Sequence, residues 1–141
     1  MALPKTWRIC VYNDSGVTLD FSTNEANEAC KVTLEKWYAK SGKIEHIAEV
    51  ELDAATDLAD GAVEALTTQS VETNVGFKGV IYAKTDNADA TGDIVLFLEW
   101  STDGGTTWPS AASGFDPDED TLPVCILALG GAVERSRPFV V

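Results

Sequence analysis

The chain has 141 residues, of which 45% are hydrophobic, so it can build one domain with its own core and is too apolar for wholesale disorder. Its formal charge is −13, which disfavours direct binding to nucleic acid or to an anionic membrane, because phosphate groups repel an acidic surface. No apolar run approaches the ~20 residues that span a bilayer, and the N-terminal stretch MALPKTWRIC has no apolar segment of signal-peptide length.

The first 52 residues predict four short strands. Each combines β-forming residues or apolar–polar alternation with a turn signal near its end. In the second, Val17, Leu19 and Phe21 share one face, and in the third the alternation loses its phase at Lys36. The stretch NEANEAC between them suits a loop or a short helical turn. The predicted strands are residues 6–13, 17–22, 30–38 and 47–52.

The middle of the chain contains both the least regular and the most regular of the residue patterns. Residues 53–65 have a helical composition with Asp57 as a candidate N-cap, but Gly61 interrupts it, so we expect a loop with at most one helical turn. Strands through residues 65–73 and 77–85 follow. Residues 93–100 contain five consecutive apolar residues between polar ends, which predicts a central strand covered on both faces.

The stretch STDGGTTWPS follows this central strand and fits the S-x-D-x-G-x-T-W pattern of the Asp-box, the turn motif of sialidase-type propellers. A propeller needs several blades of about 40–50 residues, so one copy in this chain cannot form one. We therefore interpret Asp103, Gly104, Gly105 and Trp108 as a structural hairpin. The glycines supply positive φ, Asp103 accepts hydrogen bonds from turn amides, Trp108 covers the hairpin base, and residues 106–108 begin a return strand.

The C-terminal part predicts a surface loop over residues 110–123. Two β patterns, residues 124–129 and 132–141, flank a GG turn as a last hairpin or edge pair. The whole chain therefore predicts an all-β fold of eight or nine short strands with at most one short helix. We expect a single antiparallel β-sandwich, or jelly roll, spanning residues 1–141.

Residues that could carry chemistry are few, so the sequence predicts no catalytic residue, no cofactor and no enzyme. His46 is the only histidine, and no nucleophile-elbow pattern accompanies it. Asp116, Asp118 and Asp120 are spaced like the start of a calcium loop, but later positions lack the glycine and the bidentate glutamate that such a loop needs. They remain candidate ligands for a divalent cation. The three cysteines match neither a CxxC site nor a disulfide framework, and we expect reduced core residues.

Three segments together resemble small structural proteins of tailed bacteriophages, of the head decoration or cement type. The segments are TW…VYNDSG-TL-FSTN, IYAKTDNADATGDIVLFLEWSTDGGTTWPS and FDPDED. The resemblance implies a β-sandwich without an active site that docks on the major capsid protein or on other virion proteins. It also implies synthesis in the cytoplasm of the host bacterium and a final place in the virion.

Two alternatives to a head decoration protein stay open at the level of the sequence. One is a tail or neck component of the same virion. The other is a carbohydrate-binding β-sandwich that uses exposed Trp and Asp side chains as stacking face and hydroxyl acceptor.

The ends of the chain are candidate docking arms for a protein that we expect to form a homo-oligomer. Arg135 and Arg137 are the only basic residues after Lys84, and an apolar tip that includes Phe139 follows them. We expect these three residues to contact a partner. The alternative is that residues 139–141 complete an edge strand of the chain's own sandwich.

Overall fold

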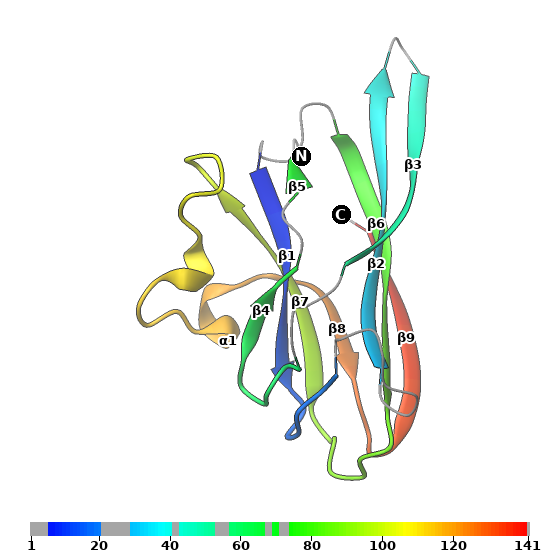
Figure 1. Cartoon of the computed structure of the whole chain (residues 1–141), viewed down its shortest axis with the longest axis vertical. Helices are drawn as coiled ribbons and strands as arrows, with labels where there is room; N and C mark the ends of the chain where they lie inside the picture. The colour runs from blue at the N-terminus through cyan, green and yellow to red at the C-terminus, as the bar shows by residue number, and fades with distance from the viewer. Residues whose placement is uncertain are drawn as a thin grey trace.

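Two antiparallel sheets pack face to face in the computed structural model (Figure 1). The structure describes residues 6–20, 29–40, 43–52, 57–66, 69–70 and 74–140. Strands dominate these residues, and their two helical segments, η1 (Pro109–Ala111) and α1 (Pro117–Asp120), are single turns. The predicted all-β sandwich is therefore confirmed.

The first sheet has the order β4–β1–β7–β8, and the short β5 also pairs with β1. The pairing of β1 with β7 runs without a register shift from Thr6↔Ser101 to Asp14↔Asp93. β7 lies between β1 and β8 and is therefore the central strand that its apolar run predicted. The strands of this sheet are β1 (Thr6–Asp14), β4 (Val63–Ala65), β5 (Gln69–Ser70), β7 (Asp93–Ser101) and β8 (Pro123–Ala128).

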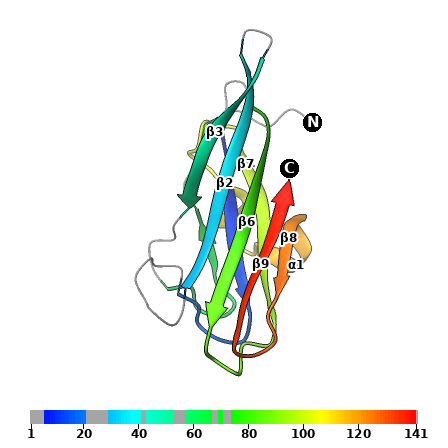
Figure 2. The ribbon, with the colours of Figure 1, turned by 90° about the vertical axis from the view of Figure 1, so that its right-hand side faces the viewer.

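The second sheet has the order β3–β2–β6–β9 and faces the viewer in Figure 2. The register of β2 on β3 shifts between Leu34 and Lys36, which is where the sequence alternation loses its phase. An irregularity of this kind bends the strand and re-aims the side chains beyond it. The strands of this sheet are β2 (Ala29–Lys40), β3 (Lys43–Leu52), β6 (Asn74–Thr85) and β9 (Val133–Val140).

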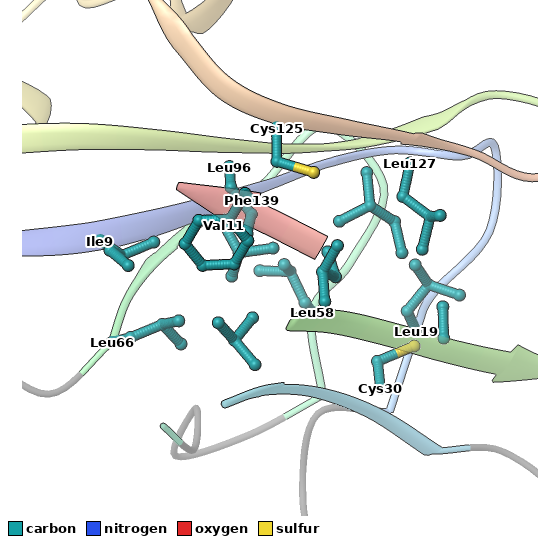
Figure 3. Close-up of a cluster of buried hydrophobic side chains, with 14 of the residues drawn as sticks. Ile9, Val11, Leu19, Cys30, Leu58, Leu66, Leu96, Cys125, Leu127 and Phe139 are labelled. Atoms are coloured by element: carbon teal, nitrogen blue, oxygen red, sulfur yellow. The ribbon is translucent and has the colours of Figure 1, made fainter. Parts of the chain in front are cut away.

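Aromatic rings join the two sheets in the core. Trp7 of β1 stacks on Phe77 of β6 with ring centroids 4.6 Å apart, and Phe139 of β9 meets Phe77 edge-on at 6.3 Å. Figure 3 shows that aliphatic side chains of β1, such as Ile9 and Val11, meet Phe139 in the same layer. Large apolar side chains buried from both sheets are the main source of stability in such a fold.

A glycine makes room for Phe139. A Cβ atom on Gly79 would lie 2.5 Å from Cζ of Phe139 and 2.4 Å from the carbonyl oxygen of Thr33. The ring therefore packs directly on the backbone of β6, and any larger residue at this position would push β9 or β2 away.

Two predictions for the first half of the chain are wrong. In the described part of the strand predicted over residues 17–22, residues 17–20 form no strand, and their one ladder contact is an isolated bridge between Leu19 and Leu58. Residues 21–28, which hold the rest of that prediction and most of the stretch NEANEAC, lie outside the described residues. The side chain of Asn13 donates to the carbonyl oxygens of Val17 and Leu58 at 2.8 Å each, so a side chain replaces the strand partner here. The strand predicted through residues 65–73 is interrupted: Ala65 ends β4, Leu66 belongs to no strand and β5 is Gln69–Ser70, while residues 67–68 and 71–73 lie outside the described part of the chain. Residues 57–62 contain a turn and no helix, which fits the expected loop with at most one helical turn.

Two predictions for the second half also need correction. Residues 106–108 form no return strand, because residues 102–122 fold back as a long loop over the first sheet. Of the two alternatives for the last two strands, the hairpin is wrong and the edge pair fits, because β8 pairs with β7 and β9 pairs with β6. They are therefore the neighbouring edges of two different sheets.

The C-terminal segment is an edge strand and not a free arm. Residues 133–140 pair with β6 in one unbroken register, and Phe139 is buried in the core. The segment therefore follows the alternative in which it completes an edge strand of the chain's own sandwich. Residues 1–5 and 141, which include the N-terminal candidate arm, lie outside the described residues.

We predict that Phe139→Ala lowers the free energy of unfolding by about 3–5 kcal/mol, because it removes a buried ring between two sheets. Val140→Ala is the matched control, since the neighbouring side chain is 78% exposed. Urea unfolding of both variants tests this. Equal midpoints for the two variants would show that β9 does not contribute its ring to the core.

Candidate functional site

Residues 101–108, which we call the Asp103 turn, form a network of local hydrogen bonds around one carboxylate. Oδ1 of Asp103 accepts hydrogen bonds from the hydroxyl of Ser101 at 2.6 Å and from the backbone N–H groups of Thr106 and Thr107 at 3.0 and 2.9 Å. Oδ2 accepts from the Thr107 hydroxyl at 2.7 Å. These donors are local, so one carboxylate organises the whole turn.

Backbone conformation explains the two glycines of the motif. Gly104 and Gly105 have φ angles of 76° and 100°, as the sequence predicts, and residues with a Cβ rarely adopt such angles. The N–H of Gly105 also donates to the Ser101 hydroxyl at 2.8 Å. Glycine and serine therefore act together to reverse the chain directly after β7.

The hydrogen bonds of the turn lower the pKa of Asp103 well below the ordinary value for an aspartate, with the Ser101 hydroxyl as the largest cause and the Thr107 donors next. Each donor stabilises the ionised form more than the neutral acid. The carboxylate is therefore charged at any pH at which the protein is handled.

Trp108 closes the turn from a half-buried position. Its indole Nε1 donates to the carbonyl oxygen of Gly105 at 3.0 Å, and the Arg8 guanidinium lies over its ring at 4.0 Å from the centroid. This is a cation–π contact. Trp108 thus packs on the turn at the surface of the first sheet, and there is no hairpin base for it to cover, because residues 106–108 form no return strand.

A buried carboxylate lies beneath Trp108. Glu99 on β7 is only 3% exposed and forms an ion pair with Arg8 of β1. Ser110 donates to it twice, from its backbone N–H at 2.9 Å and from its hydroxyl at 2.9 Å, and the Cys10 thiol donates at 3.1 Å. A buried charge of this kind is tolerated only when it is paired and hydrogen-bonded.

The contacts of Glu99 hold residues 102–122, the outer-face loop, against the first sheet. Ser110 comes from η1 in this loop and binds Glu99 of the sheet, while Phe115 packs on Phe97 of β7 with ring centroids 5.9 Å apart. The chain thereby covers the outward side of its own central strand, on the left in Figure 1. This explains why the apolar run of β7 continues on both faces.

Opposing effects act on the pKa of Glu99. Burial raises it, but the hydrogen bonds from Ser110, Cys10 and Arg8 outweigh burial and leave the pKa below its ordinary value. Burial, together with the neighbouring Glu99 charge, raises the pKa of the Cys10 thiol far above its usual range. Cys10 is therefore a thiol donor and not a nucleophile.

The three aspartates proposed as cation ligands have a local structural role. Asp116 is the N-cap of α1 and accepts from the N–H of Asp118 at 3.0 Å, while Asp120 accepts from the N–H of Asp116 at 2.8 Å. Among the described residues there is no group of three His, Cys, Asp or Glu side chains that could hold a metal ion. The spacing that resembles a calcium loop is thus the spacing of a capped helical turn.

The residues proposed for partner contact lie along the open side of the sandwich. Arg135 and Arg137 donate from Nη1 to the carbonyl oxygens of Ala128 and Ile126 on β8, at 2.9 and 2.6 Å. These residues line a shallow groove between β8 and β9. Phe139 does not face a partner, because its ring is inside the core.

Sequence reasoning missed Arg8, Glu99 and Ser110 as members of one site. A signal was present, because a glutamate inside a strand predicted to be covered on both faces requires a buried partner. His46 lies on β3 opposite Trp37, and its side chain is outside the described part of the structure. Cys10, Cys30 and Cys125 are buried free cysteines, as expected.

Comparison of the chain with protein-family models, with curated proteins and with solved structures found no match. No helix among the described residues is long and apolar enough to cross a membrane. Within the site the charges of Glu99 and Arg8 are paired internally, and the oxygens of Asp103 accept hydrogen bonds from groups of the chain itself. Such an arrangement positions a loop.

We predict that Asp103 stays ionised in acid solution in which other aspartates become protonated. Its pKa in the folded chain lies below the unfolded value of about 3.9, so the stability from the turn is complete above that pH. It is lost only as the pH falls through the lower, folded pKa. NMR titration of the Thr106 and Thr107 amide shifts measures this. A midpoint near the ordinary aspartate pKa would contradict the hydrogen-bonded turn.

We predict that Glu99→Gln lowers the free energy of unfolding by about 3 kcal/mol, because the Arg8 guanidinium loses its partner in a poorly solvated position. The outer-face loop should loosen as well, with faster cleavage by chymotrypsin after Phe115. Urea unfolding and limited proteolysis check the two effects.

Glu119→Gln is the matched control, because this exposed glutamate of α1 lies in the same loop. Equal stability and equal cleavage for the Glu99 and Glu119 variants would show that the buried carboxylate does not hold the loop.

Proposed function

We propose that this chain is a non-enzymatic structural protein of a tailed-bacteriophage virion, and most specifically a capsid decoration or cement protein. The proposal is carried by one observation. The segment in which the resemblance to such proteins is sharpest, from the apolar strand through DGGTTWP to the acidic FDPDED, is a continuous structural unit made of β7, the Asp103 turn, η1 and α1.

The architecture of this unit supports a binding role on a large assembly. The polar contact of Ser110 with Glu99 and the apolar contact of Phe115 with Phe97 fix the loop on the sheet. A rigid sandwich with internally satisfied loops presents a fixed outer surface, which is what a protein that docks on a preformed shell requires.

A binding experiment tests the proposal directly. Purified protein is mixed with undecorated shells of the phage whose genome encodes the chain, before and after shell expansion, and bound protein is measured by co-sedimentation. We expect saturable binding to shells and regularly repeated density in electron micrographs. Binding only to tails or necks would move the protein to another part of the virion, and no binding to any virion part would refute the proposal.

Carbohydrate binding is the second candidate, and one observation favours it. Trp100 at the end of β7 is 53% exposed and lies next to the Asp103 turn, so its ring could stack on a sugar. Against it, both oxygens of Asp103 accept hydrogen bonds within the turn. Quenching of tryptophan fluorescence by oligosaccharides, lost in Trp100→Ala, would favour this candidate over the virion protein.

A further inference from the structure

The two faces of the sandwich differ in what covers them. The outward side of the first sheet is covered by residues 102–122, which bury Phe97 and Glu99. On the second sheet the described outward side chains reach solvent: Val80 of β6 is 38% exposed and Val140 of β9 is 78% exposed. One face is thus covered by the chain itself, whereas no segment in the described part of the chain covers the other.

Formal charge is divided in the same way. The four strands of the second sheet hold eight basic and five acidic residues, a charge of +3, whereas the rest of the chain holds two basic and 18 acidic residues, a charge of −16. The basic residues on these strands are Lys31, Lys36, Lys40, Lys43, Lys78, Lys84, Arg135 and Arg137. The sandwich therefore has a basic sheet on one side of a strongly acidic body.

The outward face of the second sheet combines cations with apolar surface. Lys31, Lys78 and Lys84 alternate with the buried side chains of β2 and β6, as Val80 does, so these four residues point outward together. Glu35 of β2 and Glu134 of β9, which is paired with Lys84, share this side, so its described charged residues are three lysines and two glutamates, a net charge of +1. Lys78 pairs with Glu35 at 2.7 Å and is still 49% exposed. We call this surface the basic face.

The acidic counterpart lies on the opposite side of the molecule. Exposed Asp116, Asp118, Glu119 and Asp120 are gathered on and around α1. Figure 1 shows α1 on one side of the sandwich and β2, β6 and β9 on the other. Loss of solvent and the charges of Asp118, Asp60 and Asp93 raise the pKa of Asp14 at the end of β1, so the negative potential extends from α1 across the first sheet. We call this side the acidic face.

Two of the sheet edges, β8 and β9, are poor sites for adding a partner strand. On β8, the outward carbonyl oxygens of Ile126 and Ala128 already accept hydrogen bonds from Arg137 and Arg135. On β9, Pro138 has no N–H to donate. Charged side chains and prolines at edges are the usual means of preventing strand addition. Strand addition at these two edges is therefore disfavoured.

We propose that copies of this chain associate head to tail, with the basic face of one copy contacting the acidic face around α1 of the next. The four strands offer an area of about 20 Å by 30 Å, or about 600 Å², which is somewhat below the ~800 Å² that each partner buries in a standard interface. Opposite charges meet in this arrangement, and Val80 and Val140 supply apolar contact. A heterologous contact of this kind closes into a ring or continues as a stack. This association does not depend on the proposed function.

The test is a charge exchange between two variants, followed by sedimentation velocity. Lys31→Glu with Lys84→Glu reverses the basic face, and Asp118→Lys with Glu119→Lys reverses the acidic one. Asp116 and Asp120 are kept, because they make the hydrogen bonds of the α1 turn. Lys31→Arg with Lys84→Arg is the charge-conserving control. Circular dichroism confirms that each variant folds.

We expect wild type and the arginine control to associate at low salt and to dissociate at high salt, because salt screens contacts between exposed charges. Each charge-reversed variant alone should associate about 10- to 100-fold more weakly, since like charges then meet at the contact. An equal mixture of the two variants should associate again, because their reversed faces are complementary.

Three results would overturn the proposal. A wild-type chain that stays monomeric at low salt excludes self-association. If the variant with the reversed acidic face (Asp118→Lys with Glu119→Lys) still associates on its own, the contact joins two basic faces and not opposite faces. Two folded variants that stay monomeric when mixed show that charge complementarity does not drive the contact.

Discussion

The central strand β7 must be covered on both sides, and the rest of the structure follows from this requirement. Ile94 and Leu96 point into the core, while Phe97 and Glu99 point outward and are equally buried. The second sheet covers the inner side. On the outer side the chain uses residues 102–122, so a long loop that looks like an insertion is a structural layer. The Asp103 turn and its glycines reverse the chain at the end of β7 so that this layer can form.

The ion pair between Glu99 and Arg8 gives that layer its position. Apolar contact between Phe115 and Phe97 alone is non-directional, whereas Ser110 reaches Glu99 by two hydrogen bonds with defined geometry. The same arrangement leaves the chain unequal on its two sides. One side carries a loop rich in carboxylates, and the other is a sheet whose strands hold most of the basic residues.

Local patterns in the sequence were sufficient for the strands that pair over long registers. The alternation in β2 and the apolar run of β7 each identified a strand, and the loss of phase at Lys36 coincided with a register shift. Local patterns failed where side chains replaced backbone partners, as Asn13 does for Val17 and Leu58. A residue pattern cannot show that one amide side chain will take over the hydrogen bonds of a strand.

One part of the candidate site could be predicted from the sequence and the other could not, for a related reason. The Asp103 turn is built from residues within a few positions of one another, so its glycines and its acceptor could be identified from the motif. The pairing of Arg8 with Glu99 joins residues 91 positions apart, and only the register of β1 on β7 brings them together. Arg135 and Arg137 were recognised as unusual, but their carbonyl partners on β8 depend on how the two sheets meet.

The burial of all three cysteines has a consequence for the chemical surroundings that the folded chain tolerates. Burial raises the thiol pKa of Cys10 and of Cys125, and Cys30 is buried as well, so little reactive thiolate is presented to solvent. Oxidation to sulfenic acid and exchange with foreign disulfides both start from an accessible thiolate. The folded protein can therefore pass from a reducing to an oxidising compartment without forming covalent cross-links between molecules.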